Sequence, residues 1–208
     1  MNVLINYKIA RSKNSRINQV LFVDDNYSIL KLKKFFFKNE LSIASDLLKS
    51  RDLKKNFISL DINSKKKIIL VSIKKETNSS DLENLGGKFF ETFKDSFINR
   101  FIINSDSFNL QLKNGVGHFL HGIKLKSYTF EKYKTKKIKK NFSIDVVGKK
   151  IPSAKDQIKF KSIEEGTFFT RDLVSEPGNI LHPDEYAKRL GLLKKDGLKV
   201  NVYDEKKL

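Results

Sequence analysis

The chain has no cysteine and no tryptophan, and its 208 residues include only three prolines and one methionine. Without cysteine it cannot form disulfides, use a thiol nucleophile or hold zinc through thiolates. The longest apolar runs, such as Ile68 to Val71, fall far below the roughly 20 residues that a membrane-spanning helix needs. The first residues, MNVLINYKIARSKNSR, contain no apolar run of signal-peptide length. We therefore expect a soluble, unsecreted protein, with the cytoplasm as its location.

Arginine is scarce as well. The 42 basic residues exceed the 24 acidic ones by a net charge of +18, but only six of them are arginine. Such a charge suggests a nucleic-acid or other anionic partner. However, arginine is the residue whose planar fork reads phosphates and base edges, and lysine, asparagine, isoleucine and phenylalanine are abundant together, as an AT-rich coding sequence would produce. A solvated lysine-rich surface is therefore favoured, and a basic module that binds nucleic acid or a nucleotide stays open as the alternative.

Catalytic signatures are missing too: there is no nucleophile elbow, no HExxH helix and no cluster of acidic metal ligands. His118 and His121 lie three residues apart on an expected helix and could share a metal, but no further ligand follows at a recognisable spacing. Gly86 and Gly87 lack the later partners of a phosphate-binding loop, which favours close packing. The sequence therefore assigns no catalytic, metal-binding or cofactor-binding residue to this chain.

Three aromatic residues, Tyr128, Phe130 and Tyr133, stand among lysines. They could stack nucleic-acid bases on a basic platform, but packing within the domain is the favoured interpretation. Arg171 and Asp172 stand together near the end of an expected helix, where a charged pair more often orients the chain than performs chemistry.

Strand and helix patterns alternate along the first 150 residues. Helices are expected over residues 39–49, from Asp81 onward and over residues 115–126. The helix from Asp81 has one continuous apolar face, formed by Leu82, Leu85, Phe89, Phe93 and Phe97. Strands are expected over residues 2–9, 19–23, 57–62, 68–73, 101–103 and 142–147, with a further one suggested over 30–37. Polar turns join the first two strands and the pair 57–62 and 68–73, and the whole pattern indicates an α/β domain with a mixed sheet flanked by helices.

The architecture changes at residues 171–183, RDLVSEPGNILHP. Ser153 can cap a helix that starts at Ala154, and Pro177 with Gly178 would end it. Pro183 suits the first turn of another helix, which Gly197 would end.

A strand is expected over residues 198–203, where apolar and polar residues alternate, and Asp204 could cap one more helix. Asn179 can bond backbone groups in the turn. The expected domains are residues 1–150, a connecting helix over 151–175, and the truncated start of a second domain over 176–208. Residues after about Ser175 should be loosely held.

Two segments carry a resemblance to a known family. RDLVSEPGNILHPDEYAKRL resembles the entry into the catalytic domain of leucyl (cytosol) aminopeptidases, and GIKLKSYTFEKYKTKK, residues 122–137, resembles a segment near the end of the N-terminal domain of that family. Two matches in the right order are more specific than either alone. The chain departs from the family at Ser175, where asparagine is usual, and at His182, where threonine or tyrosine is frequent.

The resemblance implies that this chain is the N-terminal domain, connecting helix and first part of the catalytic domain of such an enzyme. The implied N-terminal fold is similar to that of macro domains. The full-length enzymes release N-terminal amino acids from peptides, preferably leucine, with two divalent zinc or manganese ions held by aspartate, glutamate and lysine. They form homohexamers, and some also bind DNA. Their NTDAEGR run is absent from this sequence, so the resemblance implies no metal and no peptidase activity for this chain alone.

Overall fold

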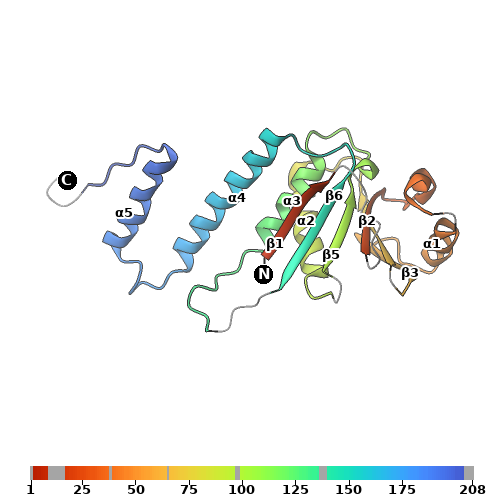
Figure 1. The fold of residues 1–208 in the computed structure, drawn as a ribbon, viewed down its shortest axis with the longest axis horizontal. Helices are drawn as coiled ribbons and strands as arrows, with labels where there is room; N and C mark the ends of the chain where they lie inside the picture. The colour runs from red at the N-terminus through yellow and green to blue at the C-terminus, as the bar shows by residue number, and fades with distance from the viewer. Residues whose placement is uncertain are drawn as a thin grey trace. The chain divides into compact units, whose positions relative to one another are not determined.

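The computed structural model describes residues 2–8, 17–37, 39–64, 66–96, 99–135 and 140–203. The chain forms two compact units, Met1–Glu164 and Glu165–Leu208. The division falls within the long helix α4 (Ala154–Ser175). The domain boundaries expected at residues 150 and 175 stay a prediction. Figure 1 shows both units and labels their α-helices.

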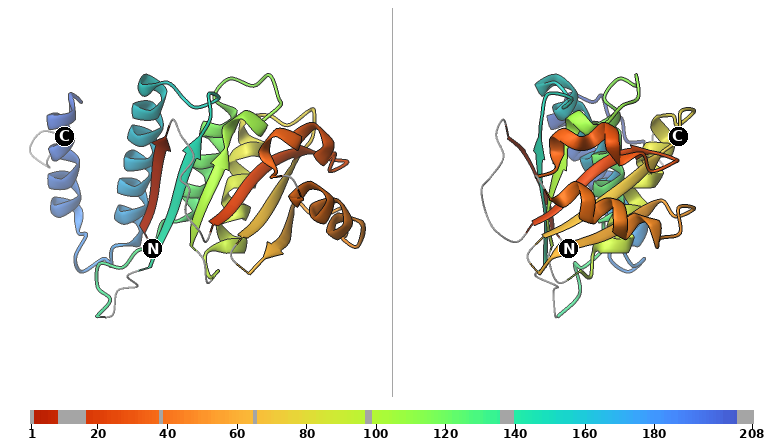
Figure 2. Two further views of the ribbon diagram at one scale, coloured as in Figure 1. Left: turned by 45° about the vertical axis from the view of Figure 1, so that its right-hand side comes forward. Right: turned by 90° about the vertical axis from the view of Figure 1, so that its right-hand side faces the viewer.

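A six-stranded mixed sheet forms the centre of the first unit, in the order β1-β6-β5-β2-β4-β3. All neighbouring strands are parallel except β3 and β4, which are antiparallel. In the left view of Figure 2 the arrowheads of β1, β6 and β5 share one edge of the sheet. The strands are β1 (Asn2–Lys8), β2 (Ile17–Asp24), β3 (Phe57–Asn63), β4 (Lys66–Ile73), β5 (Arg100–Asn104) and β6 (Asn141–Val147).

Six of the predicted strands, over residues 2–9, 19–23, 57–62, 68–73, 101–103 and 142–147, are confirmed, apart from Ile9, which lies outside the described residues. The mixed sheet with flanking helices is confirmed as well. A turn between the first two strands would usually make them neighbours in the sheet. In the structure β1 and β2 are not neighbours, because β6 and β5 lie between them. The antiparallel pair of β3 and β4 is the one predicted around a polar turn.

Helices cover both faces of this sheet. One face packs on α2 (Ser79–Phe93) and α3 (Gly115–Lys126), and the other packs on α1 (Glu40–Lys49). All three helices confirm the sequence predictions. Asn78 caps α2, since its side chain accepts a hydrogen bond from the Asp81 backbone N–H and the Asp81 carboxylate accepts one in return. Phe97, which was assigned to the apolar face of this helix, lies outside the described residues.

The strand suggested over residues 30–37 is wrong, because this segment is the 3₁₀ helix η1 (Ile29–Phe35). Its buried side chains are Ile29, Leu32 and Phe35, while Leu30 is 73% exposed. A spacing of three matches the three residues per turn of a 3₁₀ helix, so this is the spacing that places all three side chains on the sheet.

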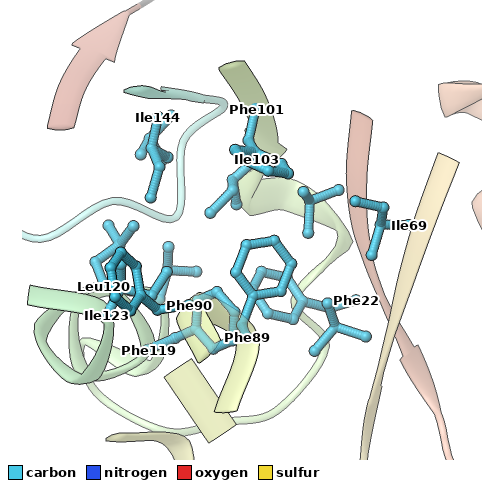
Figure 3. Packing of buried hydrophobic residues seen from close by; sticks show 14 of the residues in the cluster. Phe22, Ile69, Phe89, Phe90, Phe101, Ile103, Phe119, Leu120, Ile123 and Ile144 are labelled. Carbon is cyan, nitrogen blue, oxygen red and sulfur yellow. The ribbon is translucent and has the colours of Figure 1, made fainter. Parts of the chain in front are cut away.

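The larger core is rich in phenylalanine (Figure 3). Phe89 of α2 lies at its centre, and its ring centroid is 5.4 Å from Phe101, 5.5 Å from Phe119 and 5.6 Å from Phe57. These rings meet edge to face, which is a favoured aromatic geometry. The strand residues alternate, so that every second side chain enters this core and the others face α1 or solvent.

Glycines let α2 and α3 approach closely. A Cβ added to Gly86 would lie 1.9 Å from the Phe119 carbonyl oxygen, and one added to Gly122 would lie 1.9 Å from the Glu83 carbonyl oxygen. Both distances are shorter than a carbon–oxygen contact allows, so each helix needs its glycine at the crossing. The interpretation of Gly86 as a packing residue is confirmed, whereas Gly87 has only ordinary contacts.

The second unit contains the rest of α4, helix α5 (Pro183–Gly191) and the 3₁₀ helix η3 (Leu192–Asp196). The predicted start of α4 is confirmed, because the Ser153 hydroxyl accepts a hydrogen bond from the Asp156 backbone N–H at 3.2 Å. Pro183 occupies the first turn of α5, and Gly197 ends η3 with φ at +87°, as predicted.

The strand predicted over residues 198–203 is wrong, since the structure has no regular element there. A strand exists through its backbone ladder with a neighbour, and no described segment pairs with these residues. Asp204, the suggested helix cap, lies outside the described part of the chain. No helix among the described residues is long and apolar enough to cross a membrane.

Candidate functional site

The two histidines of α3 each contact a different glutamate. The Nδ1 of His118 lies 2.8 Å from Glu83 Oε1 on α2, and the Nδ1 of His121 lies 3.0 Å from Glu164 Oε1 on α4. Both glutamates were missed from the sequence, since each is more than thirty residues away from its histidine. The two histidines thus contact carboxylates on different helices, and this arrangement agrees with the structural interpretation of the pair.

The first half of α4 is anchored to α3 by the same histidines. The ring of Phe160 has its centroid 5.1 Å from that of His118 and 5.2 Å from that of His121. A Cβ on Gly117 would lie 2.6 Å from this phenylalanine ring, so the glycine makes room for it. Glu164 also faces Tyr7 of β1, where burial and the negative charge of the glutamate raise the pKa of the tyrosine to about 12.

The aromatic segment after α3 contains two ring contacts within itself. The rings of Phe130 and Tyr133 meet edge to face with centroids 5.8 Å apart. The Lys132 ammonium lies 5.6 Å from the centroid of the Tyr133 ring, which is 50% exposed. Tyr128 and Phe130 are half-buried. These contacts agree with the packing interpretation and leave Tyr133 as the exposed aromatic of the three.

The turn between α4 and α5 is held by a buried ion pair. Arg189 Nη1 donates to Glu176 Oε1 at 2.8 Å, and the glutamate side chain is 1% exposed. Arg189 Nε also donates to Glu185 Oε1 at 3.0 Å, and this bond holds the pKa of Glu185 below its usual value. Arg171 and Asp172 have contacts of their own. Neither glutamate partner was identified from the sequence, although a carboxylate before a Pro-Gly turn and an arginine on the next helix are a readable pair.

A cavity of about 290 Å³ opens at the carboxyl ends of β2 and β4, beside η1 and the segment that follows β5. Its buried lining includes Phe22, Leu32, Phe35 and Ile73. Ser107 is also buried there, where its hydroxyl accepts a hydrogen bond from the Phe22 backbone N–H at 2.9 Å. The cavity therefore has an apolar floor whose walls are fixed by hydrogen bonds between segments distant in the sequence.

Charged groups surround the entrance of this cavity. Asp24 Oδ1 accepts a hydrogen bond from the Ser28 backbone N–H at 2.8 Å, and Lys31 Nζ lies 3.4 Å from Asp24 Oδ2. Asp106 Oδ1 accepts a hydrogen bond from the Lys149 backbone N–H at 2.7 Å. Lys34 and Lys75 complete the charged lining. The sequence analysis did not identify these residues, although polar groups directly after Val23 and Asn104 are the signal that could have done so.

Metal-binding groups do not gather in the part of the chain that the structure describes. Within it, no three His, Asp or Glu side chains lie close enough to hold a metal ion. The aspartate, glutamate and lysine set that the family resemblance requires for two metals is therefore not assembled by these residues.

Comparison with known proteins identifies the same family as the two motifs. A curated protein from Bradyrhizobium sp., named probable cytosol aminopeptidase, is 38% identical over 88 residues, which is 40% of this chain and 18% of the relative. One from Methylorubrum extorquens with the same name is 32% identical over 109 residues, covering 50% of this chain and 22% of the relative. No protein-family model matches the chain. The chain covers only about a fifth of these relatives.

Solved structures extend the likeness to nearly the whole chain. A tomato leucine aminopeptidase variant matches with a TM-score of 0.74 and 18% identity, covering 99% of this chain and 45% of that one. The cytosol aminopeptidase from Coxiella burnetii matches with a TM-score of 0.59 and 15% identity over 91% of this chain and 37% of its own. At these identities the likeness concerns the fold. Together with the curated relatives it confirms the predicted resemblance to the N-terminal part of the leucyl aminopeptidase family.

Proposed function

We propose that this chain, which is similar in sequence and fold to the N-terminal part of leucyl aminopeptidases, serves as the N-terminal domain and connecting helix of a cytosolic, metal-dependent aminopeptidase. The observation that carries the proposal is the 38% identity to a cytosol aminopeptidase over 88 residues, together with a fold match that spans 99% of this chain. The reaction of the whole enzyme is the release of N-terminal amino acids from peptides.

The chemistry belongs to the part of the enzyme that this chain does not contain. Two divalent ions, zinc or manganese, would activate the attacking water there. The described residues of this chain do not fit such a metal pair, because no three metal-binding side chains gather among them. The chain therefore contributes structure to the enzyme, and we assign no step of the reaction to its side chains.

The structural contribution is a first unit with a packed core, joined to the helix α4, which continues into the second unit. The contacts of Phe160 and Glu164 with the α3 histidines hold the first turns of α4 against the first unit. The ion pair between Arg189 and Glu176 then sets the turn into α5.

The alternative, a stand-alone basic module for nucleic acid or a nucleotide, is not favoured, because the matched relatives are named as aminopeptidases. The net charge of +18 would give weak, salt-sensitive binding to DNA in any case. Binding that disappears at physiological salt and shows no sequence preference would reflect this charge alone.

The test is hydrolysis of a leucine amide by two purified proteins in the presence of Mn²⁺ or Zn²⁺. One protein is this chain, and the other is the same chain joined to the catalytic half of a cytosol aminopeptidase relative. We expect no metal-dependent hydrolysis by the chain alone and chelator-sensitive hydrolysis by the joined protein. Hydrolysis by the chain alone would overturn the assignment of the chemistry to the other half.

A further inference from the structure

The cavity at the carboxyl ends of β2 and β4 lies where connections diverge. After β2 the chain turns into η1 on the face covered by α1, whereas after β5 it passes through η2 (Ser105–Ser107) toward α3 on the opposite face. Because β2 and β5 are neighbours in the sheet, their connections part directly above them. In open α/β sheets, such a switch point outside the carboxyl ends of the strands is where ligands bind.

The floor of the cavity suits an apolar group. Phe22, Leu32, Phe35 and Ile73 line it and are between 1% and 7% exposed. No side chain of the histidine contacts on α3, or of the turn at Glu176, contributes to this lining. The cavity is thus a separate feature that the aminopeptidase proposal leaves without a role.

The charged residues that line the cavity, Lys31, Lys34 and Lys75 with Asp24 and Asp106, sum to a net charge of +1. Asp24 and Asp106 are engaged by neighbouring groups, namely the Ser28 and Lys149 backbone N–H groups and the Lys31 ammonium. By contrast, Lys34 and Lys75 form no ion pair with any residue that the structure describes. The Lys34 ammonium lies 5.0 Å from the centroid of the Phe35 ring, which places it directly beside the apolar floor.

The size of the cavity limits the ligand. A volume of about 290 Å³ corresponds to about ten water molecules at their share of the liquid volume, which is at the small end of ligand sites. A branched acid of six carbons would fit this space. Inorganic phosphate could contact the lysines but would leave the apolar floor unused.

We propose that this cavity binds a small aliphatic carboxylate, with its apolar chain on the floor formed by Leu32, Phe35 and Ile73 and its carboxylate between Lys34 and Lys75. The proposal does not depend on the aminopeptidase assignment, because it rests only on the residues that line this cavity, all of which belong to the first unit. The same carboxylate chemistry could come from a free amino acid or from a simple branched acid.

The experiment is a titration of the 208-residue chain, followed by isothermal calorimetry and by the backbone amide signals of Leu32, Asn109 and Leu110. The probes are 4-methylpentanoate, leucine, isoamylamine and inorganic phosphate. We expect 4-methylpentanoate to saturate with a dissociation constant on the order of 1 mM, as for a ligand of few atoms. If leucine binds with similar affinity, the natural ligand is a free amino acid. If leucine does not bind while 4-methylpentanoate does, the natural ligand is a simple branched acid.

Matched variants separate the site from general charge. The double variant Lys34→Ala with Lys75→Ala should weaken 4-methylpentanoate binding at least tenfold. The control, Lys54→Ala with Lys88→Ala, removes two exposed lysines elsewhere and should change it less than twofold. Equal loss in both variants, equal binding of phosphate or of isoamylamine, or no saturable binding of 4-methylpentanoate would each overturn the proposal. Equal thermal unfolding of the two variants confirms that both are folded.

Discussion

The two units differ in what they bury. The first unit holds two buried apolar clusters, one on each face of its sheet. Among the described residues of the second unit, Leu173 and Glu176 are the buried ones, and large apolar side chains are exposed, among them Val174 at 82%, Leu192 at 54% and Val202 at 52%. Burial of apolar surface is the main source of folding free energy. The stability of this chain therefore resides in the first unit, and the second unit depends on local contacts.

This difference predicts unequal resistance to proteolysis, which is the largest effect that we expect. Local opening exposes the backbone, and it needs little free energy where few apolar contacts must break. Under limited trypsin digestion, lysine and arginine sites after Ser175 should be cut at least tenfold faster than those within the described elements of the first unit. Mass spectrometry of the fragments identifies the order of cutting. Equal rates at both would contradict the comparison.

A substitution at the centre of the larger core should be far more costly than one at an exposed apolar position. Phe89→Ala removes a ring that contacts several others and should lower the free energy of unfolding by about 3 to 5 kcal/mol. Val174→Ala, at an exposed site of the second unit, should change it by less than about 0.5 kcal/mol. Denaturant titration followed by circular dichroism measures both, and a comparable loss in the two variants would break the comparison.

The second unit has one contact whose removal should matter. Arg189→Ala removes the arginine that pairs with the buried Glu176 carboxylate and should destabilise the α4–α5 turn. Lys188→Ala is the control, because Lys188 is largely exposed and pairs with Glu185 at the surface. Amide hydrogen exchange of α5 should accelerate in the arginine variant and stay nearly unchanged in the lysine variant. Unchanged exchange in both would show that the turn is held by other contacts.

Two glycines sharpen the comparison with effects of opposite sign. Gly122→Ala would place a Cβ 1.9 Å from the Glu83 carbonyl oxygen, which forces α2 and α3 apart and should cost about 1 to 3 kcal/mol. Gly166→Ala meets nothing within 4 Å inside α4 and should stabilise that helix by about 0.5 to 1 kcal/mol. Thermal unfolding measures the effect of Gly122→Ala. The helix content near α4 measures the effect of Gly166→Ala. A stabilising Gly122→Ala would refute the close crossing.

Alkaline pH should weaken the first unit gradually. Burial is the main cause that raises the pKa of Tyr7 and of Tyr27 from 10 to about 12. The negative charge of Glu164 raises the pKa of Tyr7 further, and that of Asp52 raises the pKa of Tyr27. Because the folded-state values lie above the unfolded ones, this contribution to stability is complete below pH 10 and is lost as pH rises toward 12. Unfolding midpoints measured between pH 9 and pH 12, with Tyr7→Phe as the matched variant, test this. A wild-type midpoint that does not fall, or falls no faster than that of the variant, would contradict it.

Local patterns predicted the helices of the first unit well. Apolar residues at steps of three and four define α2 in the sequence, and the residues Leu82, Leu85, Phe89 and Phe93 do face the core. The segment at η1 was misjudged because Leu30 and Leu32 alternate with lysines like a strand, while the side chains that are buried follow a period of three. Short apolar runs do not distinguish these two periods.

The sequence alone did not predict which distant segments of the chain pair with each other. Nothing local indicates that β1 pairs with β6, nearly 140 residues later, or that Glu164 lies against His121. The cavity residues were missed for the same reason, because Asp24, Lys75 and Asp106 come together only when three strands end at one edge. The resemblance to leucyl aminopeptidases, by contrast, could be recognised from two short segments, since motifs depend on residue identity and not on pairing.

The most direct test of the central claim is the coding DNA immediately downstream of the codon for Leu208. If this chain is the N-terminal part of an aminopeptidase, the reading frame should continue into a catalytic domain with an NTDAEGR run and its aspartate, glutamate and lysine metal ligands. A stop codon directly after Leu208 would contradict the account and would leave the first unit as a protein whose role must come from its own surfaces.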